Sequence, residues 1–456
     1  MKSLSLMGAL LIAGLPVLGC NGTTNPTPSV GGTGAFGVIT IGGKQLLYYP
    51  NLNVTPAGNG FLSVIDVGQA GNGITGSNAL VTTIDLGTTD QATTTAGNAN
   101  VVVAAGINTY NVWFINPSNN TVTKTLQLDP SLNGDEFSGG GGIVTGIAMD
   151  EANNRAILSV WDGFIFIDLG SMTMTGSVTS APSENFGFDG THELVLNPFY
   201  SCGDLGITGD GGTDAGFCAS YQVLDGGGLI TDGLNVINLT TNQVFTYENL
   251  AAAAPTTPLG SEPDSAASDP TLQIAVIPSE GTGQQNFLDL SKAVYDSTNL
   301  TFTAPQTIVQ PSGSYTGVAI ESKTHLAFFE EEHESGIAVV DLTQLSINND
   351  AGITATGLVE ATMPDTPITD AGGGNGWGNL GDPHGIAVTT GLQSNGPVGF
   401  VITDDGAGDV WVGRLDLQKM LSLGASAGQS AGSPGSVLSA SQVSPAVTMF
   451  NGAVKE

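Results

Sequence analysis

Basic residues are scarce in this sequence. Its 456 residues include 41 Asp and Glu but only nine Lys and Arg, which gives a formal net charge of −32 at pH 7. A surface this negative repels phosphate backbones and anionic lipid headgroups. We therefore expect neither nucleic acid nor a nucleotide cofactor to bind, and we expect cations, either metal ions or basic ligands, to be favoured partners. The alternative is that the charge serves only solubility outside the cytoplasm.

The motifs of several common chemistries are absent as well. The chain has three Cys and four His, without a CxxC pair or a CxxCH motif, so we expect no haem and no site built from clustered Cys and His. The Gly-x-Ser-x-Gly motif of many serine hydrolases is missing. The acidic segment 209–214, GDGGTD, is too short for an EF-hand loop.

Apolar residues and glycine dominate what is present. Apolar residues make up 40% of the chain, and a mean hydropathy of +0.15 is too high for a chain that is mostly disordered. The 66 Gly are about twice the usual share, and many lie in the turns between short apolar runs. This composition indicates an all-β protein, and the length permits one large β domain.

Residues 1–19 have the pattern of a secretory signal peptide. Lys2 precedes an apolar run over 4–13, which is too short to span a bilayer. The segment 17–20, Val-Leu-Gly-Cys, resembles the lipobox of bacterial lipoproteins, although Leu18 stands where a small residue is preferred. This resemblance implies that Cys20 becomes the diacylated N-terminus. Ordinary secretion with a free Cys20 is the alternative.

The export pattern sets expectations for the residues that follow it. Residues 20–35 predict a flexible tether rich in Gly, Thr and Pro. Residue 21 is Asn, not Asp, which by resemblance to the sorting rule of enteric bacteria favours the outer membrane, on its periplasmic or cell-surface side. We expect membrane contact only through the lipid anchor. In an oxidising compartment Cys202 and Cys218 predict a disulfide that stabilises the fold by roughly 3 kcal/mol.

Residues 36–456 contain a repeated phrase, an apolar alternating run that ends in Asp or Asn. The phrases end 50, 52, 70, 51, 52 and 75 residues apart, so the base period is near 51. Each longer interval contains an insertion, the Cys202–Cys218 loop in the first and GGGNGWGNLGDP with GLQSNGP in the second. The phrases are FLSVID ending at Asp66, VWFIN at Asn116, FIFID at Asp168, LNVIN at Asn238, NFLD at Asp289, IAVVD at Asp341 and GRLD at Asp416.

The same order of four strands surrounds each phrase. In the third unit we expect strands over 145–150, 155–160, 163–169 and 174–180, and in the sixth over 315–321, 324–330, 336–342 and 357–363. Seven units of four short antiparallel strands predict a single seven-bladed β-propeller, whose blades bury both faces against their neighbours. A loose excursion over 421–445 is expected before a closing strand near 447–450.

The phrase with Ile-Asp in the third strand resembles the repeats of YVTN-type propellers, a broad family of exported seven-bladed proteins. The resemblance covers nearly all of residues 36–450, and it implies the fold but no activity. We interpret the repeated Asp as structural, because its carboxylate is placed to accept hydrogen bonds from the turn before the fourth strand.

Acidic residues fall in the loops that a propeller gathers at one face. Loops before first strands and loops between second and third strands share that face, so we expect an acidic rim there. Crowded carboxylates repel one another unless a cation or protons offset the charge, and Ca²⁺ prefers oxygen ligands. A solvated rim without metal is the alternative. The predicted Ca²⁺ ligands are Asp204, Asp210, Asp214, Glu330, Glu332, Asp382, Asp404 and Asp405.

His384 is the strongest catalytic candidate. It lies in an Asp-Pro-His-Gly turn that resembles the blade entrance of some propeller enzymes, including streptogramin lyases and quinoprotein-like propellers. With His333 and Glu331 it would provide an acid–base pair. His192 and His325 precede second strands at the opposite face, and we interpret them as surface or packing residues.

These observations favour a binding or interaction module for a cation, a glycan or a protein partner. The alternatives are a propeller enzyme that uses His384, either a metal-assisted lactonase-type hydrolase or a lyase, and an envelope protein with a mechanical role.

Overall fold

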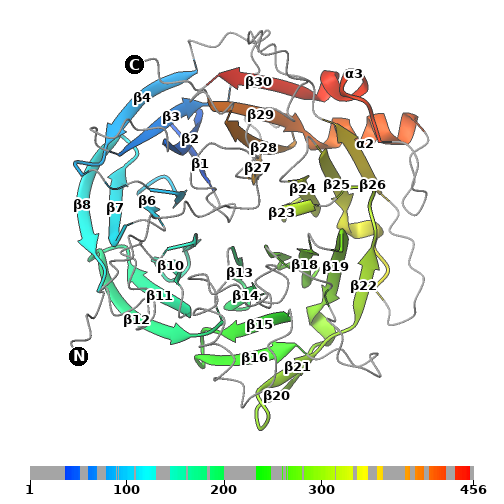
Figure 1. Cartoon of the computed structure of the whole chain (residues 1–456), viewed down its shortest axis with the longest axis horizontal. Helices are drawn as coiled ribbons and strands as arrows, with labels where there is room; N and C mark the ends of the chain where they lie inside the picture. Colours follow the sequence, from blue (N-terminus) through cyan, green and yellow to red (C-terminus); the bar gives the residue numbers. More distant parts are fainter. Residues whose placement is uncertain are drawn as a thin grey trace, which may run out of the picture.

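The computed structural model of this chain is a ring of seven small sheets around a central axis, and each sheet forms one blade of a β-propeller (Figure 1). The predicted all-β, seven-bladed fold is therefore confirmed. The structure describes residues 36–51, 60–68, 79–88, 90, 92–106, 109–129, 144–160, 163–181, 185–199, 233–247, 259, 263, 265–279, 282–313, 315–331, 336–347, 357–362, 386–390, 396–404, 410–427 and 437–451.

The strands follow one another around the ring, each blade running from the central channel outwards. Blade 1 contains β1 (Gly37–Ile41), β2 (Lys44–Asn51), β3 (Phe61–Asp66) and β4 (Leu80–Asp85). Blade 2 contains β5 (Thr94–Gly97), β6 (Val102–Ala105), β7 (Asn111–Asn116) and β8 (Thr121–Gln127). Blade 3 contains β9 (Gly146–Asp150), β10 (Arg155–Val160), β11 (Gly163–Asp168) and β12 (Thr173–Thr179). Blade 4 contains β13 (Gly187–Asp189), β14 (Leu194–Phe199), β15 (Gly233–Asn238) and β16 (Gln243–Tyr247).

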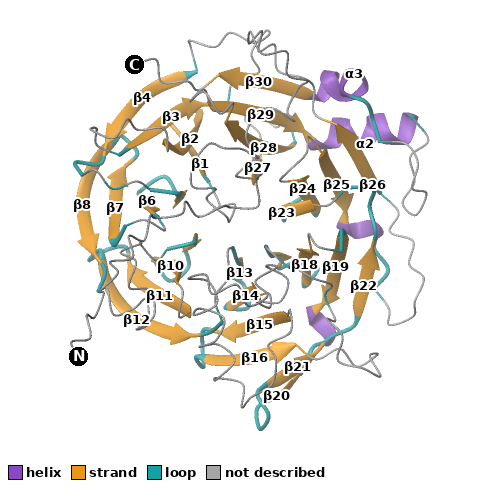
Figure 2. Ribbon diagram, in the orientation of Figure 1, coloured by secondary structure: helices purple, strands orange, loops and turns teal. Residues whose placement is uncertain are grey.

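The remaining blades follow the same order, with additions. Blade 5 contains β17 (Ala267–Asp269), β18 (Ile274–Ser279), β19 (Gln284–Asp289) and β22 (Gln306–Val309). Blade 6 contains β23 (Tyr315–Glu321), β24 (Leu326–Glu331), β25 (Gly336–Asp341) and β26 (Leu358–Thr362). Blade 7 contains β27 (Ile386–Thr390), β28 (Pro397–Asp404), β29 (Val410–Asp416) and β30 (Val447–Asn451). The described helices are η2 (Leu290–Lys292), η3 (Leu342–Gln344), α2 (Leu417–Ser426), α3 (Ala440–Val443) and η6 (Ser444–Ala446) (Figure 2).

Strand direction defines two faces of the ring. First strands begin, and second strands end, at what we call the upper face, as Gly146 and Val160 do in blade 3. The turns from first to second strands and from third to fourth strands lie at the opposite, lower face. The strands observed in blades 3 and 6 confirm the predicted strands to within two residues. The long separations between β14 and β15 and between β26 and β27 lie within the two long intervals of the repeat.

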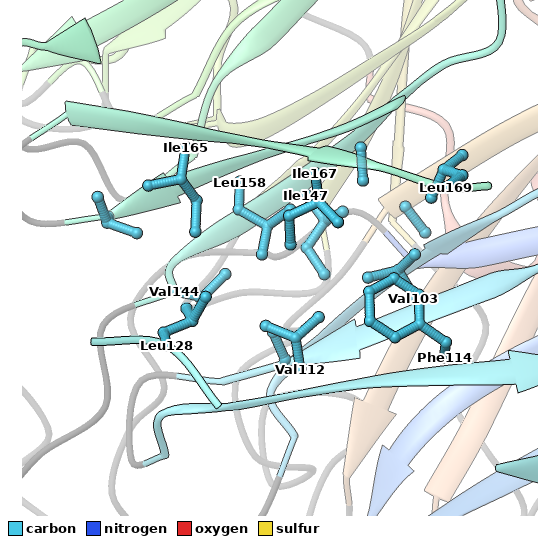
Figure 3. Packing of buried hydrophobic residues seen from close by; sticks show 14 of the residues in the cluster. Val103, Val112, Phe114, Leu128, Val144, Ile147, Leu158, Ile165, Ile167 and Leu169 are labelled. Carbon is cyan, nitrogen blue, oxygen red and sulfur yellow. The ribbon is translucent and has the colours of Figure 1, made fainter. Parts of the chain in front are cut away.

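The core lies between blades, because each third strand sends alternate side chains to its two neighbours. In blade 3, Ile165 and Ile167 pack against Val112 and Phe114 of blade 2 (Figure 3). Phe164 of the same strand packs in a second cluster toward blade 4. This two-sided burial explains why the phrases are apolar at nearly every position, and it confirms that blades bury both faces.

The Asp or Asn that ends each phrase has the structural role expected of it. Asp168 Oδ1 accepts a hydrogen bond from the Ser171 amide at 2.6 Å, which stabilises the lower-face turn before β12. Asn238 accepts from the amide of Thr240 at 3.0 Å, and Asp341 accepts from the amide of Thr343 at the same distance. In blades 3 and 4 these turns lead directly into the fourth strand, whereas Asp341 caps the short helix η3, which precedes β26 by more than ten residues.

The same turns predict a loss of stability in acid. Burial alone would raise the pKa of Asp289, but hydrogen bonds from Lys292 and Ser291 outweigh it and lower the pKa. A carboxylate with a depressed pKa stabilises the fold above its unfolded pKa of about 3.9, and this stabilisation is lost as the pH falls through the folded value. Asp289→Asn is expected to lower the free energy of unfolding by about 1 kcal/mol at pH 7. Urea titrations at pH 7 and pH 3 test this: a deficit equally large at pH 3 would contradict it.

One hairpin departs from the repeat. β20 (Val294–Asp296) and β21 (Thr301–Thr303) are inserted between the third and fourth strands of blade 5, and they extend the sheet of blade 4 to six strands. β21 pairs in parallel with β16, with Thr301 opposite Thr246. Tyr295 holds the hairpin in place, since its ring lies 5.0 Å from that of Phe245. Blades 4 and 5 are therefore joined through their outer strands (Figure 1).

The ring closes without exchange of strands between its ends. β30 pairs antiparallel with β29, so blade 7 is built from the C-terminal strands alone, and blade 1 from the N-terminal strands alone. The closing strand predicted near 447–450 is therefore confirmed. The two blades meet through apolar packing of Leu47 and Ile65 with Phe400 and Val412.

The segment before β30 is more ordered than the loose excursion that we expected. Asp416 caps α2 by accepting from the amide of Lys419 at 2.9 Å. Gly424 lets α2 approach the side chain of Val359 on β26, and Leu438 forms a parallel bridge with Ala361 of the same strand. These contacts cover the outer edge of blade 6, the kind of edge that proteins protect. None of the helices in the described ranges is long and apolar enough to cross a membrane.

Candidate functional site

The upper face is where the predicted site residues were expected to gather. Of these, Glu330 and Glu331 end β24, and Asp404 ends β28, so all three lie at upper strand ends. The other candidates lie outside the described residues, as do Cys20, Cys202 and Cys218, so their pairing and roles stay predictions. These other candidates are His333, His384, Glu332, Asp204, Asp210, Asp214, Asp382 and Asp405.

Glu330 and Glu331 both belong to β24, whereas the sequence pattern ended this strand at Glu330 and counted both residues among those of the upper loop. Successive strand residues point to opposite faces of a sheet. Glu331 therefore faces blade 5, as Phe329 does, and Glu330 faces blade 7, as Phe328 does. Both side chains are buried, with exposed fractions of 0% for Glu330 and 8% for Glu331. The two carboxylates consequently belong to different blade interfaces and cannot share one ion.

Glycines make room for these carboxylates. A Cβ on Gly317 would lie 2.8 Å from Cγ of Glu330. A Cβ on Gly336 would collide with Oε2 of Glu331, and one on Gly313 would lie 3.1 Å from the same oxygen. Any larger residue at these positions would displace a carboxylate. The Glu331 carboxylate is therefore seated between the linker that enters blade 6 and the start of β25.

Tyr315 lies next to the Glu331 carboxylate. It lies opposite Glu331 in the pairing of β23 with β24, and it is 2% exposed. Its hydroxyl donates to Oε1 of Glu360 at 3.2 Å, and it also lies 3.4 Å from the Ile337 carbonyl. Burial first, and then the negative charges of Glu360 and Glu331, raise the pKa of Tyr315 well above its usual value. The phenol therefore stays protonated and serves as a donor.

Glu360 ties the linker into the outer part of the blade. Its Oε1 accepts from both the amide and the hydroxyl of Ser312 at 2.7 Å. The linker over 310–313, which leads into the innermost strand β23, is thus hydrogen-bonded to β26, the outermost strand of the same blade. Tyr315, Glu360 and the glycines were not predicted as site residues. The sequence could have indicated Tyr315 together with Glu331, because the two residues lie at the upper ends of adjacent predicted strands. No feature of the sequence indicated Glu360, which belongs to the fourth strand.

The two described histidines lie at the lower face, as expected. His192 Nδ1 lies 2.8 Å from Oδ2 of Asp189 within the turn of blade 4. His325 Nδ1 lies 2.7 Å from Oδ2 of Asp269, and this contact joins blade 6 to blade 5. Both histidines thus have packing roles far along the strands from the upper face.

Charge is separated between the two faces. Four ion pairs of Lys or Arg and two His–Asp contacts join described residues, and each of the six lies at the lower face. Arg155, for example, contacts Asp150 at 2.6 Å and also pairs with Glu193 of the next blade. By contrast, the sequences that connect strand ends at the upper face contain no Lys or Arg, although they hold many Asp and Glu. Among the described residues, contacts between acids and Lys, Arg or His are thus found at the lower face, and the connecting sequences of the upper face supply no Lys or Arg to pair with their acids.

The donor set limits which metals fit. Among the described residues, no three His, Cys, Asp or Glu come together as a group that could hold a metal ion. The described upper-face groups are carboxylate, amide and hydroxyl oxygens, which suit hard cations rather than zinc or copper.

Comparison with known proteins bears on the fold alone. No protein-family model matches the chain, and no curated protein sequence matches it. Kuenenia stuttgartiensis hydrazine synthase is similar in structure, with a TM-score of 0.46 and 10% identity over 86% of this chain and 97% of that one. A complex of KlAtg21 with the coiled-coil of AgAtg16 gives a TM-score of 0.43 and 8% identity, over 84% of this chain and 94% of that one. At such low identity these similarities carry no information about activity.

Proposed function

We propose that this protein is an exported, lipid-anchored binding module whose upper face binds a divalent cation, Ca²⁺, and through that face engages a glycan or protein partner. The observation that carries the proposal is the separation of charge. Lys and Arg form ion pairs with acids of the lower face, such as Asp150 and Asp289, whereas the connections at the upper face contain no Lys or Arg. Repulsion among those acids is relieved when a cation binds.

The propeller fold is consistent with an interaction module. Its blades are rigid, because apolar clusters fill the interfaces between them, and the strand ends at the upper face are joined by connecting segments of up to 33 residues. Binding sites are often carried by loops on such scaffolds. Calcium is the favoured ion because it takes six to eight oxygen ligands in flexible geometry.

The signal peptide and lipobox support export and anchoring at Cys20, and the spacing of the repeat supports a relation to the exported YVTN-type propellers. The described ring begins at Phe36, just before the upper end of β1, so a tether over 20–35 would join the ring at the acidic face. Labelled palmitate tests the anchor. Cys20→Ser is expected to abolish incorporation and release the protein from membranes, and undiminished labelling of that variant would rule out Cys20.

A calcium titration tests the proposed binding. We expect 10 mM CaCl₂ to raise the thermal midpoint of chelator-treated protein by about 4 °C, because a ligand present at 100 times its Kd stabilises the folded state by roughly 2.7 kcal/mol. The same concentration of MgCl₂, which dehydrates reluctantly, is expected to give a smaller rise. A midpoint that does not change in calcium would refute cation binding.

A further inference from the structure

We propose that Glu331 and Gln285 form a buried Ca²⁺ site at the upper end of the interface between blades 5 and 6. This inference rests on the proposed binding of a cation by the upper face, and it deepens that proposal by giving the ion a location and a donor set. Glu331 was predicted from sequence only as a catalytic residue, and Gln285 was not singled out.

The strand register places the two side chains at the same level. Phe287 of β19 and Phe329 of β24 meet across the interface, with ring centroids 6.5 Å apart. Gln285 lies two residues above Phe287, and Glu331 lies two residues above Phe329, because the strands run in opposite directions between the faces. Alternation directs both into the gap between the same two sheets. They are therefore neighbours across the top of this interface.

Gln285 supplies an observation independent of the acids. It is 2% exposed, and its Nε2 donates to the Tyr315 carbonyl at 3.5 Å, which turns its amide toward β23. Its Oε1 is buried and has no hydrogen-bond partner among the described residues. Burying an acceptor in this way costs about 1–3 kcal/mol unless a donor or a cation reaches it. Such an atom is unusual in a folded protein and points to a bound species.

A second buried oxygen belongs to Thr316, the residue after Tyr315, whose carbonyl accepts from Gln285. Thr316 is the extra residue of a bulge between Tyr315 and Gly317, and Oγ1 of Thr316 also lacks a partner among the described residues. The Thr316 carbonyl accepts from the Ser265 hydroxyl at 2.5 Å, which holds the bulge against blade 5. Bulges often re-aim side chains at functional positions. Two buried neutral oxygens, of Gln285 and of Thr316, thus lack a described partner around Tyr315, the residue that pairs with Glu331.

The electrostatic surroundings favour a cation. The charged groups that act on Tyr315 at this level are the carboxylates of Glu360 and Glu331. Of the two, Glu331 lies on the second strand, on the side of β24 that faces blade 5, whereas Glu360 belongs to the fourth strand and bonds Ser312. A site with one carboxylate and neutral oxygens, completed by water, matches the chemistry of Ca²⁺ and not that of a metal held by Cys and His.

Isothermal titration of full-length protein with CaCl₂ tests the site. Gln285→Met keeps the length and removes the oxygen, and it is expected to weaken calcium binding at least tenfold. Glu331→Gln is expected to weaken it more. Glu321→Gln is the matched control, a buried glutamate of the same blade that caps a lower-face turn, and it is expected to bind calcium as the wild type does.

The calcium-free proteins separate a ligand role from a structural one. Without calcium, Gln285→Met is expected to melt no lower than the wild type, because it no longer buries an unsatisfied oxygen. A purely structural glutamine would instead melt lower and keep its calcium affinity. If both variants bind calcium like the wild type, the ion lies elsewhere and only this site is refuted. If the wild type binds none, the site and the proposed function fail together.

Discussion

Ending the chain at Ala446, which removes β30, is expected to lower the free energy of unfolding by about 5 kcal/mol or more. β30 pairs with β29 from Val447 to Asn451 and covers the outer part of blade 7. Its loss would expose Leu415 and Val412, which are fully buried, and would leave β29 as an open edge. Because Val412 also packs in the cluster that joins blades 7 and 1, the closure of the ring would weaken as well.

Urea denaturation followed by near-ultraviolet circular dichroism measures this loss, and size-exclusion chromatography detects the aggregation that an open edge would cause. The matched control removes only residues 452–456 and leaves β30 intact, so it is expected to unfold like the full chain. A chain ending at Ala446 that keeps the full-length midpoint would show that β30 contributes nothing to closure.

Gly163→Ala is expected to lower the free energy of unfolding by roughly 4 kcal/mol, the largest effect of a single added methyl group in the ring. Gly163 has a φ of +132°, which L residues rarely adopt. Its added Cβ would also lie 2.6 Å from the Ser180 amide nitrogen and collide with the Val178 carbonyl oxygen. Backbone atoms of β12 cannot move aside without breaking the ladder that β11 and β12 share.

Two other glycines separate strain from collision. Gly42 has a φ of +57° with open space around its Cβ position, so Gly42→Ala is expected to cost only about 1 kcal/mol. Gly176 has ordinary strand geometry, and its Cβ would lie 3.6 Å from Phe166, so Gly176→Ala is expected to be neutral or slightly stabilising. Equal losses in the Gly163 and Gly42 variants would contradict the role of the collision.

The fold was largely predictable because its determinants recur along the chain. Each phrase marks a third strand, and the Asp or Asn at its end, such as Asp168, bonds within its own turn. The hairpin of β20 and β21 escaped prediction because it leaves the spacing between Asp289 and Asp341 unchanged. The order of α2 escaped because its reason lies in Val359, a residue of another blade that Gly424 contacts.

The candidate site was predictable only in part. The sequence pattern identified Glu330 as a calcium ligand and Glu331 as a catalytic residue, but it ended the strand at Glu330 and could not show that β24 continues to Glu331. That difference turns two adjacent acids into residues of separate interfaces. Gln285 and Tyr315 come from other strands, and only the packing of blade 5 on blade 6 brings them to Glu331. Contacts of this kind do not recur at a fixed interval along the chain, so a sequence pattern cannot reveal them.

Because the ring closes without strand exchange, the chain does not have to begin at blade 1. The four strands of every blade come from one stretch of chain, and each linker runs from an outermost strand to the innermost strand of the next blade, as 86–93 does between β4 and β5. A peptide joining Asn451 to Phe36 would make the same crossing from β30 to β1. The chain is therefore suited to circular permutation. New termini can be placed in an upper-face linker between two blades, so that a different blade becomes the first one.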